Sequence, residues 1–333
     1  MFYSIRHLTK FRYSAAVSES VMQLRMHPRS EGPQRCLNFQ VTVTPRAGVR
    51  SYRDYLGNVV HHFDVPSAHR QLTIVAETMV DVAAQPGLPA NLGPDVWERL
   101  DADIGARDFW EMLAPSQFSQ WTAGIEDFAR ELSLPTGREV RGRDPLEVLL
   151  GINSAVYQAI AYVPKSTRVD SPVDDALRSR QGVCQDYAHI MIALVRRLGI
   201  PCRYVSGYLF HRKEARTRSS EGATHAWVEA YLPDLGWVGL DPTNNVVAGE
   251  SHVRTAVGRD YADVPPTHGI FRGTTESELY VAVHVEASEE PPALDRKLPI
   301  PDDWSVLVER AQQPPEPAIP FLDLQQMQQQ QQQ

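Results

Sequence analysis

The sequence predicts an α+β protein, with a small antiparallel β domain ahead of a core built from helices and strands. Residues 1 to about 85 alternate apolar and polar side chains, which is typical of strands in a half-buried sheet. Apolar residues at helical spacing follow, and strand patterns return after residue 202. Of the 333 residues, 42% are apolar and 22% are charged, which is sufficient for a globular protein with a substantial core.

The first domain, expected over residues 1–85, is predicted from strand patterns alone. Residues 37–44 alternate apolar and polar side chains, and residues 74–82 repeat this pattern. Gly57 precedes a valine-rich run and predicts a hairpin turn, because glycine adopts positive φ without strain. The Pro- and Gly-rich stretch 84–94 then marks a linker to the second domain.

Helices open the second domain, which is expected over residues 86–290. Ser116 is predicted to cap a helix that continues to about residue 132. Asp144 and the proline after it supply the N-cap and first position of a second helix. A third helix is expected over residues 184–198, and a glycine and a proline follow its end.

Strands are expected again in the later part of the second domain, including a C-terminal strand. The segments that read as strands are 203–210, 224–232, 237–241 and 279–285. The polar stretch 211–222 is predicted to be a mobile loop. Residues 291–333 hold a Pro-rich segment and a Gln-rich end that offer no packed core, so this third region is predicted to be extended and disordered.

Charge and composition argue against several classes of protein. The net charge of −8 disfavours nucleic-acid binding, which needs a basic surface. The first 13 residues lack the apolar run of a secretory signal. The longest apolar run, Ile190 to Val195, is far shorter than the roughly 18 residues needed to span a bilayer. Together with an odd number of cysteines, this favours a cytoplasmic protein without a membrane partner.

Cys184 is the candidate nucleophile because it opens the predicted third helix. The unpaired N–H groups and the positive dipole end of a helix N-terminus favour a thiolate over a thiol. The same N–H groups can stabilise an oxyanion. The alternative is that Cys184 is a small buried hydrophobic residue, which is the common fate of a free cysteine.

His225 and Asp241 are the candidate partners of this thiol, chosen from their places in a predicted hairpin. A thiolate needs a group that takes and returns a proton, and a third group that orients the imidazole. Pro233 to Gly236 forms a strong turn signal between the two strands. A loop with an even number of residues would put Asp241 on the face away from His225, so we predict an odd loop or a bulge.

Two other arrangements of histidine and cysteine compete with this triad. His189 follows Cys184 closely and could act as a second base, but we interpret it as a hydrogen-bonded core residue. The second alternative is a zinc site formed by Cys184, Cys202, His189 and His225. However, 17 residues separate the two cysteines, whereas zinc pairs are typically separated by about two to four. We therefore expect no metal and no cofactor, and we interpret Cys202 as a core residue.

Four motifs in this order strongly resemble the bacterial transglutaminase-like superfamily. They lie at residues 180–189, 199–208, 225–229 and 236–244. Residues 1–85 look like the β domain that precedes the core in one bacterial branch of that family.

The resemblance implies a papain-like fold with a transglutaminase core, as in cysteine proteinases. It also implies Cys184 as nucleophile, His225 as base and then acid, and Asp241 as the residue that orients the imidazole. Thr167, Arg168 and the segment Gly258 to Tyr261 belong to the pattern of the same branch.

The predicted chemistry is acyl transfer from a protein or peptide amide through a thioester. Hydrolysis is favoured over cross-linking, because many bacterial members of the family resemble peptidases or amidases. Transamidation is the alternative reaction, and a non-catalytic binding scaffold with the same fold is the alternative class. The chain lacks a calcium loop of the EF-hand type, which agrees with an expected reaction without metal.

Overall fold

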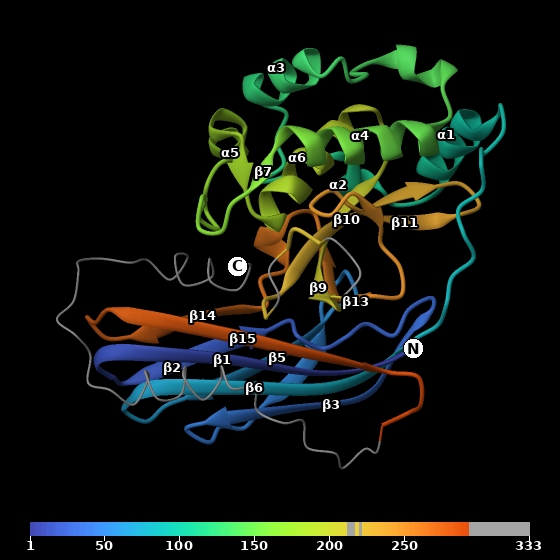
Figure 1. The fold of residues 1–333 in the computed structure, drawn as a ribbon. Coiled ribbons are helices and arrows are strands. Elements are labelled where there is room, and N and C mark those ends of the chain that lie inside the picture. Colours follow the sequence, from blue (N-terminus) through green and yellow to red (C-terminus); the bar gives the residue numbers. More distant parts are fainter. Residues whose placement is uncertain (212–216, 220–221, 293–333) are drawn as a thin grey trace.

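A computed structural model of the protein describes residues 1–211, 217–219 and 222–292. Figure 1 shows two layers of strands on one side of the molecule and a helical layer on the other, with a central sheet between them. The fold is therefore mixed, with antiparallel sheets and six α-helices among the described residues.

Two four-stranded antiparallel sheets form the β domain. The first has the order β15-β1-β6-β3 and the second has the order β14-β2-β5-β4. Their strands are β1 (Phe2–Val17), β2 (Glu19–Leu24), β3 (Gln34–Thr44), β4 (Arg50–Arg53), β5 (Val59–Val65), β6 (His69–Val82), β14 (Thr267–Arg272) and β15 (Ser277–Ser288). Phe11, Leu24, Phe63 and Leu72 are buried between the sheets, which explains the alternating sequence pattern. The predicted hairpin turn is also present, with φ of +78° at Gly57.

The C-terminal strand differs from the expected arrangement. We predicted it within the core domain, but β15 pairs with β1 and β14 pairs with β2. The register of β15 runs from Phe2 opposite Ser288 to Tyr13 opposite Ser277. An alternating pattern reveals a strand but carries no information about the sheet edge that it joins, so the sequence could not place this one.

Helices cover one face of the central sheet. They are α1 (Val96–Ala106), α2 (Trp110–Leu113), α3 (Ala123–Glu131), α4 (Pro145–Ala159), α5 (Val173–Ser179) and α6 (Cys184–Arg197). Two were predicted well: Asp144 caps α4 through the N–H of Leu146, and α6 begins at Cys184. The predicted cap of α3 was wrong. Thr122 caps this helix, while the hydroxyl of Ser116 contacts Ser119 and Arg196 instead.

The central sheet has the order β12-β11-β10-β9-β13. Its strands are β9 (Cys202–Leu209), β10 (His225–Leu232), β11 (Gly236–Asp241), β12 (Val246–Val247) and β13 (His252–Gly258). A short parallel pair, β7 (Ala161–Tyr162) and β8 (Gln181–Gly182), leads into α6. Ala226, Val228 and Ala230 of β10 belong to the same buried cluster as α6. This helix is buried almost all round, as expected from its apolar sequence.

Two buried amide side chains join the β domain to β13 of the central sheet. Gln34 pairs with the backbone N–H and C=O of Arg254, with both distances at 2.8 Å. Asn58 pairs in the same way with Val257, with both distances at 2.9 Å. Each amide thus provides hydrogen-bond partners for the backbone N–H and C=O groups at the edge of β13, as a neighbouring strand would.

No helix of the described residues is long and apolar enough to cross a membrane. The Pro-rich and Gln-rich region beyond residue 292 and most of the predicted loop 211–222 lie outside the described residues.

Candidate active site

Cys184, the first residue of α6, is held at the start of a buried helix. The N–H of the preceding residue, Val183, donates to Oδ2 of Asp186 at 2.8 Å. Thr167 Oγ1 donates to the same oxygen at 2.5 Å. A Cβ on Gly182 would lie 2.9 Å from the Cβ of Asp186, so a glycine is needed where the chain enters α6. These contacts place the thiol of Cys184 beside the unpaired N–H groups of the first helical turn.

The register of β10 and β11 puts His225 and Asp241 on one face of the sheet. Leu232 pairs with Gly236, so the loop between the strands has three residues. This confirms the prediction of an odd loop. Asp234 and Gly236 have positive φ values of 65° and 70°, which allow the chain to reverse within this loop.

His225 contacts Asp241 on one side and Cys184 on the other. Its Nε2 donates to Oδ2 of Asp241 at 2.8 Å, because a carboxylate can only accept. Its Nδ1 is buried and meets no nitrogen or oxygen partner among the described residues. This nitrogen is the one left for Cys184, whose thiol contributes a side-chain hydrogen bond to the ring.

The electrostatics of this site favour a protonated His225. Burial alone would lower the pKa of His225, but the charge and hydrogen bond of Asp241, followed by those of Cys184, outweigh it and raise the pKa. Burial has the opposite effect on a carboxyl group, so burial alone would raise the pKa of Asp241. The charge and hydrogen bond of His225 and the contact with His252 instead hold the pKa of Asp241 well below its usual range.

Asp241 is fully buried and receives five hydrogen bonds. Its Oδ2 accepts from His225, from Asn244 Nδ2 at 2.7 Å and from His252 Nε2 at 3.2 Å. Its Oδ1 accepts the N–H groups of Thr243 and Asn244 at 3.0 and 3.2 Å. A carboxylate has about four lone-pair sites, so its acceptor capacity is fully used.

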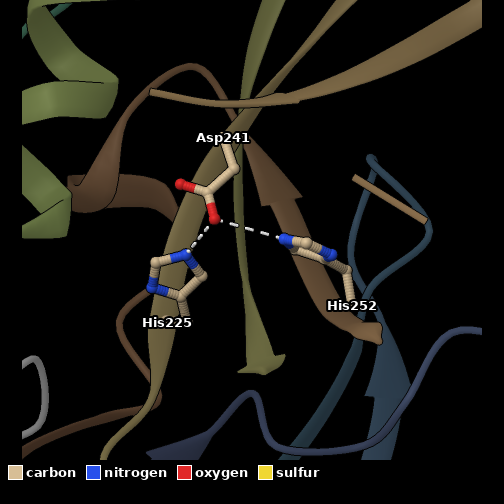
Figure 2. Close-up of side chains that lie close together, drawn as sticks. All are labelled: His225, Asp241 and His252. Atoms are coloured by element: carbon tan, nitrogen blue, oxygen red, sulfur yellow. Dashed lines mark hydrogen bonds and ion pairs between the residues drawn. The ribbon is translucent and has the colours of Figure 1, made fainter. Parts of the chain in front are cut away.

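His252 is a site residue that the sequence analysis did not identify. It begins β13 and is only 8% exposed. Figure 2 shows the Asp241 carboxylate lying between the rings of His225 and His252, with a dashed contact to each. Eleven histidines occur in the chain, and no motif distinguishes His252 from the other ten. Its contact with Asp241 depends on how β13 is placed beyond β9 in the sheet.

The same three residues have the composition of a metal site. One ligand atom of each of His225, Asp241 and His252 lies within 4.8 Å of the others. However, the N–H of Gly249 lies 3.3 Å from Nδ1 of His252, so this nitrogen accepts and the ring proton is on Nε2. A metal at Nε2 would need the lone pair of that nitrogen. The tautomer therefore favours a hydrogen-bonded network over cation binding.

His189 and Cys202 occupy the core positions that we expected. His189 Nε2 accepts the N–H of Tyr261 at 3.2 Å, and its ring stacks on Phe118. Burial lowers the pKa of His189 to about 4, so the ring is neutral at pH 7. Cys202 is fully buried, and burial raises the pKa of its thiol to about 12. Neither residue belongs to the cluster of possible ligands found among the described residues.

Comparison with known proteins shows two family matches along the chain. Residues 3–81 match the bacterial transglutaminase-like N-terminal region, and residues 136–242 match the transglutaminase-like superfamily. The second match includes the candidate residues Cys184, His225 and Asp241.

Relatives of similar length occur in mycobacteria. An uncharacterized protein of Mycobacterium leprae is 31% identical over 280 residues, which cover 84% of this chain and 96% of the relative. An uncharacterized protein of Mycobacterium tuberculosis is 34% identical over 291 residues, with 83% and 90% covered. A protein-glutamine gamma-glutamyltransferase of Pseudomonas aeruginosa is 32% identical over 136 residues, which cover 35% of this chain and 19% of that protein.

A solved structure shares the fold over most of the chain. It is a Cytophaga hutchinsonii protein proposed to be a cysteine protease, with a TM-score of 0.63 and 22% sequence identity. The match covers 89% of this chain and 94% of the other. This likeness supports the predicted papain-like fold with a preceding β domain.

Proposed function

The chain belongs to the transglutaminase-like superfamily, and from this premise we propose that it transfers acyl groups from amides through a thioester on Cys184. The Cys184 thiolate adds to the carbonyl carbon of a peptide or glutamine side-chain amide. The C–N bond then breaks as the His225 imidazolium gives its proton to the departing amine. The acyl group remains on sulfur until water or another amine attacks it, with His225 now accepting a proton. Asp241 keeps the imidazole aligned throughout.

The observation that carries this proposal is the chain of contacts from a helix-start cysteine through His225 to Asp241. His225 uses Nε2 for Asp241 at 2.8 Å, which leaves Nδ1 for Cys184. This division of the two ring nitrogens is what a general base needs, because one nitrogen exchanges the proton while the other keeps the ring oriented.

The raised pKa of His225 supports the same assignment. An imidazolium that persists at neutral pH stabilises a neighbouring thiolate by its charge. Cys36 lacks this environment, because burial raises the pKa of its thiol. The ring of His27 lies 4.0 Å from the Cys36 sulfur, but burial lowers the pKa of that ring and so disfavours an imidazolium. Cys184 is therefore expected to be the reactive cysteine.

Hydrolysis of the thioester is the first candidate on the family resemblance alone, and transamidation is the second candidate, which the burial of the reacting atoms favours. Cys184 and His225 are only 1% and 3% exposed, so bulk water is largely excluded from the reacting atoms. Water exclusion of this kind favours an amine acceptor if the site can seat one. The two reactions differ only in the acceptor, and one assay can separate them.

A mass-spectrometric assay tests the proposed function. The full-length protein is incubated with a peptide library and a primary amine, and the masses report cleavage, deamidation or amine incorporation. We expect such products with the wild-type protein and with Cys36→Ala, and their loss in Cys184→Ala. Accumulation of cleaved or deamidated peptides would indicate hydrolysis, and amine adducts would indicate transamidation.

The competing reading is a binding scaffold that keeps the fold without the reaction. It predicts no peptide product, and equally slow labelling of all three cysteines by iodoacetamide at neutral pH. The enzyme reading predicts faster labelling of Cys184 than of the other two, and a slower rate in His225→Ala. Equal labelling together with unchanged peptides would refute the proposed function.

A further inference from the structure

His252 holds the Asp241 carboxylate from the side opposite His225, and its own orientation is determined by two contacts. The N–H of Gly249 donates to Nδ1 of His252 at 3.3 Å, so the ring proton of His252 is on Nε2. Trp227 packs edge-on against the ring with the centroids 5.2 Å apart. In β9, a Cβ on Gly207 would lie 2.6 Å from Trp227, so the absence of a side chain at Gly207 leaves room for the indole ring.

The two histidines share Oδ2 of Asp241 with Asn244, whose Nδ2 donates to it at 2.7 Å. His225 and His252 both direct Nε2–H at Oδ2 of Asp241, at 2.8 and 3.2 Å. Each hydrogen bond stabilises negative charge on that oxygen, so a second donor leaves less of the charge available to the first. His252 is therefore placed to weaken the attraction between Asp241 and His225 while it holds the carboxylate still.

We propose that His252 is a positioning residue that fixes Asp241 and limits how tightly Asp241 holds the proton-bearing ring of His225. This inference rests on the proposed function, because it explains how His225 can act as an acid as well as a base. An imidazolium bound too tightly would keep the proton that the departing amine requires. A neutral donor on Oδ2 lowers that attraction without adding a positive charge beside the thiolate.

Apart from their mutual interaction and the neutral donors Thr243 and Asn244, the groups that contribute most to the pKa shifts of His225 and Asp241 are Cys184 and His252. Asp241 and Cys184 face His225, and both act to raise its pKa. His252 faces Asp241 and His225, and it stays neutral because burial lowers its pKa more than Asp241 raises it. The positive charge of His225 lowers the pKa of His252 further. Protonation of His252 is therefore disfavoured at neutral pH, where His225 is an imidazolium.

The experiment compares His252→Leu, which removes the donor, with His252→Gln, whose amide N–H can replace it. Nitrogen-15 NMR of histidine-labelled full-length protein measures the pKa of His225 directly. We expect that pKa to rise by about one unit in His252→Leu, the size of one lost hydrogen bond, and to stay near the wild-type value in His252→Gln. His69→Leu is the matched control, because it removes a histidine of similar burial that bonds Ser20 in the β domain.

Activity adds a second measurement. If a peptide substrate is found, the alkaline limb of kcat/KM should move to higher pH by about one unit in His252→Leu, because loss of the imidazolium requires a higher pH. If His252 were merely structural, its replacement would lower kcat/KM at every pH, and the alkaline limb of the pH profile would not move.

Three results would overturn the inference. They are an unchanged pKa of His225 in a folded His252→Leu protein, an equal shift in His69→Leu, and a wild-type spectrum showing His252 protonated on Nδ1. The last measurement needs no variant, so it decides the question even if His252→Leu does not fold. The NMR titration needs no substrate either, so a failure of the proposed function appears as absent products and not as an unchanged pKa.

Discussion

At the scale of single residues, the charge on Asp241 favours the protonated form of His225. The carboxylate raises the pKa of His225, and the imidazolium in turn lowers the pKa of Asp241. Because the folded state raises the pKa of His225, the pair stabilises the protein below the ordinary pKa of histidine. This stabilisation is lost as the pH rises through the pKa of His225 in the folded protein. The depressed pKa of Asp241 gives stability above the ordinary pKa of aspartate that is lost in acid.

Asp241→Asn tests this coupling. The neutral amide no longer supports the imidazolium, so the pKa of His225 should fall. The rate of Cys184 alkylation at pH 7 should then drop by up to about 30-fold, because an ordinary thiol keeps a few per cent of thiolate at that pH. Iodoacetamide labelling followed by mass spectrometry across the pH range measures both effects. Asp127→Asn, which removes an exposed carboxylate that pairs with Arg130, should leave the labelling profile unchanged. Equal profiles for Asp241→Asn and the wild-type protein would contradict the assigned role of Asp241.

At the scale of elements, the point at which α6 begins determines where the thiol of Cys184 lies. The chain passes from β8 into the helix within two residues, and Gly182 lies against Asp186 with no room for a side chain. The hydrogen bonds of Asp186 to Val183 and Thr167 hold this turn. A displaced helix start would move the thiol of Cys184 away from His225.

Gly182→Ala and Gly151→Ala form a matched pair that tests this requirement. A Cβ at Gly182 would lie 2.9 Å from Asp186, so we expect a loss of stability of about 1–3 kcal/mol and slower alkylation of Cys184. Gly151 lies inside α4 with no atom within 4 Å of an added Cβ. Its replacement by alanine should stabilise the protein by about 0.5–1 kcal/mol. Urea unfolding measures both, and equal effects of the two substitutions would argue against a special role for Gly182.

At the scale of the whole molecule, the β domain and the central sheet are joined by strands and by buried polar groups. β14 and β15 come after the central sheet in the chain and complete the two sheets of the β domain. Asn58 is fully buried and pairs with both backbone groups of Val257. It also bonds Arg29 and Asp54, so it links three segments at one point.

Asn58→Ala should therefore lower the free energy of unfolding by about 1–3 kcal/mol, because it leaves buried backbone groups of β13 without partners. Asn38→Ala is the control, since Asn38 is exposed on β3 and its replacement should change stability by less than about 0.5 kcal/mol. Chemical denaturation followed by tryptophan fluorescence and circular dichroism measures both. A loss in Asn58→Ala no larger than in Asn38→Ala would show that this junction contributes little.

Local patterns in the sequence determined much of this architecture. The cap and proline of α4, the start of α6 at Cys184 and the hairpin that carries His225 follow from signals within a few residues of each element. Capping, periodicity and turn chemistry act over such short distances, so the sequence reveals them without the fold. The cap of α3 is the exception, because Ser116 is drawn into contacts with Arg196, a residue distant in the chain.

The tertiary structure alone decided which strands meet. It placed β15 beside β1 and brought His252 to Asp241. The physical reason is that a strand pattern specifies which side chains are buried but not the neighbour that buries them. Cys184, His225 and Asp241 could be proposed from their own segments, whereas the second histidine on the carboxylate exists only through the order of strands in the central sheet.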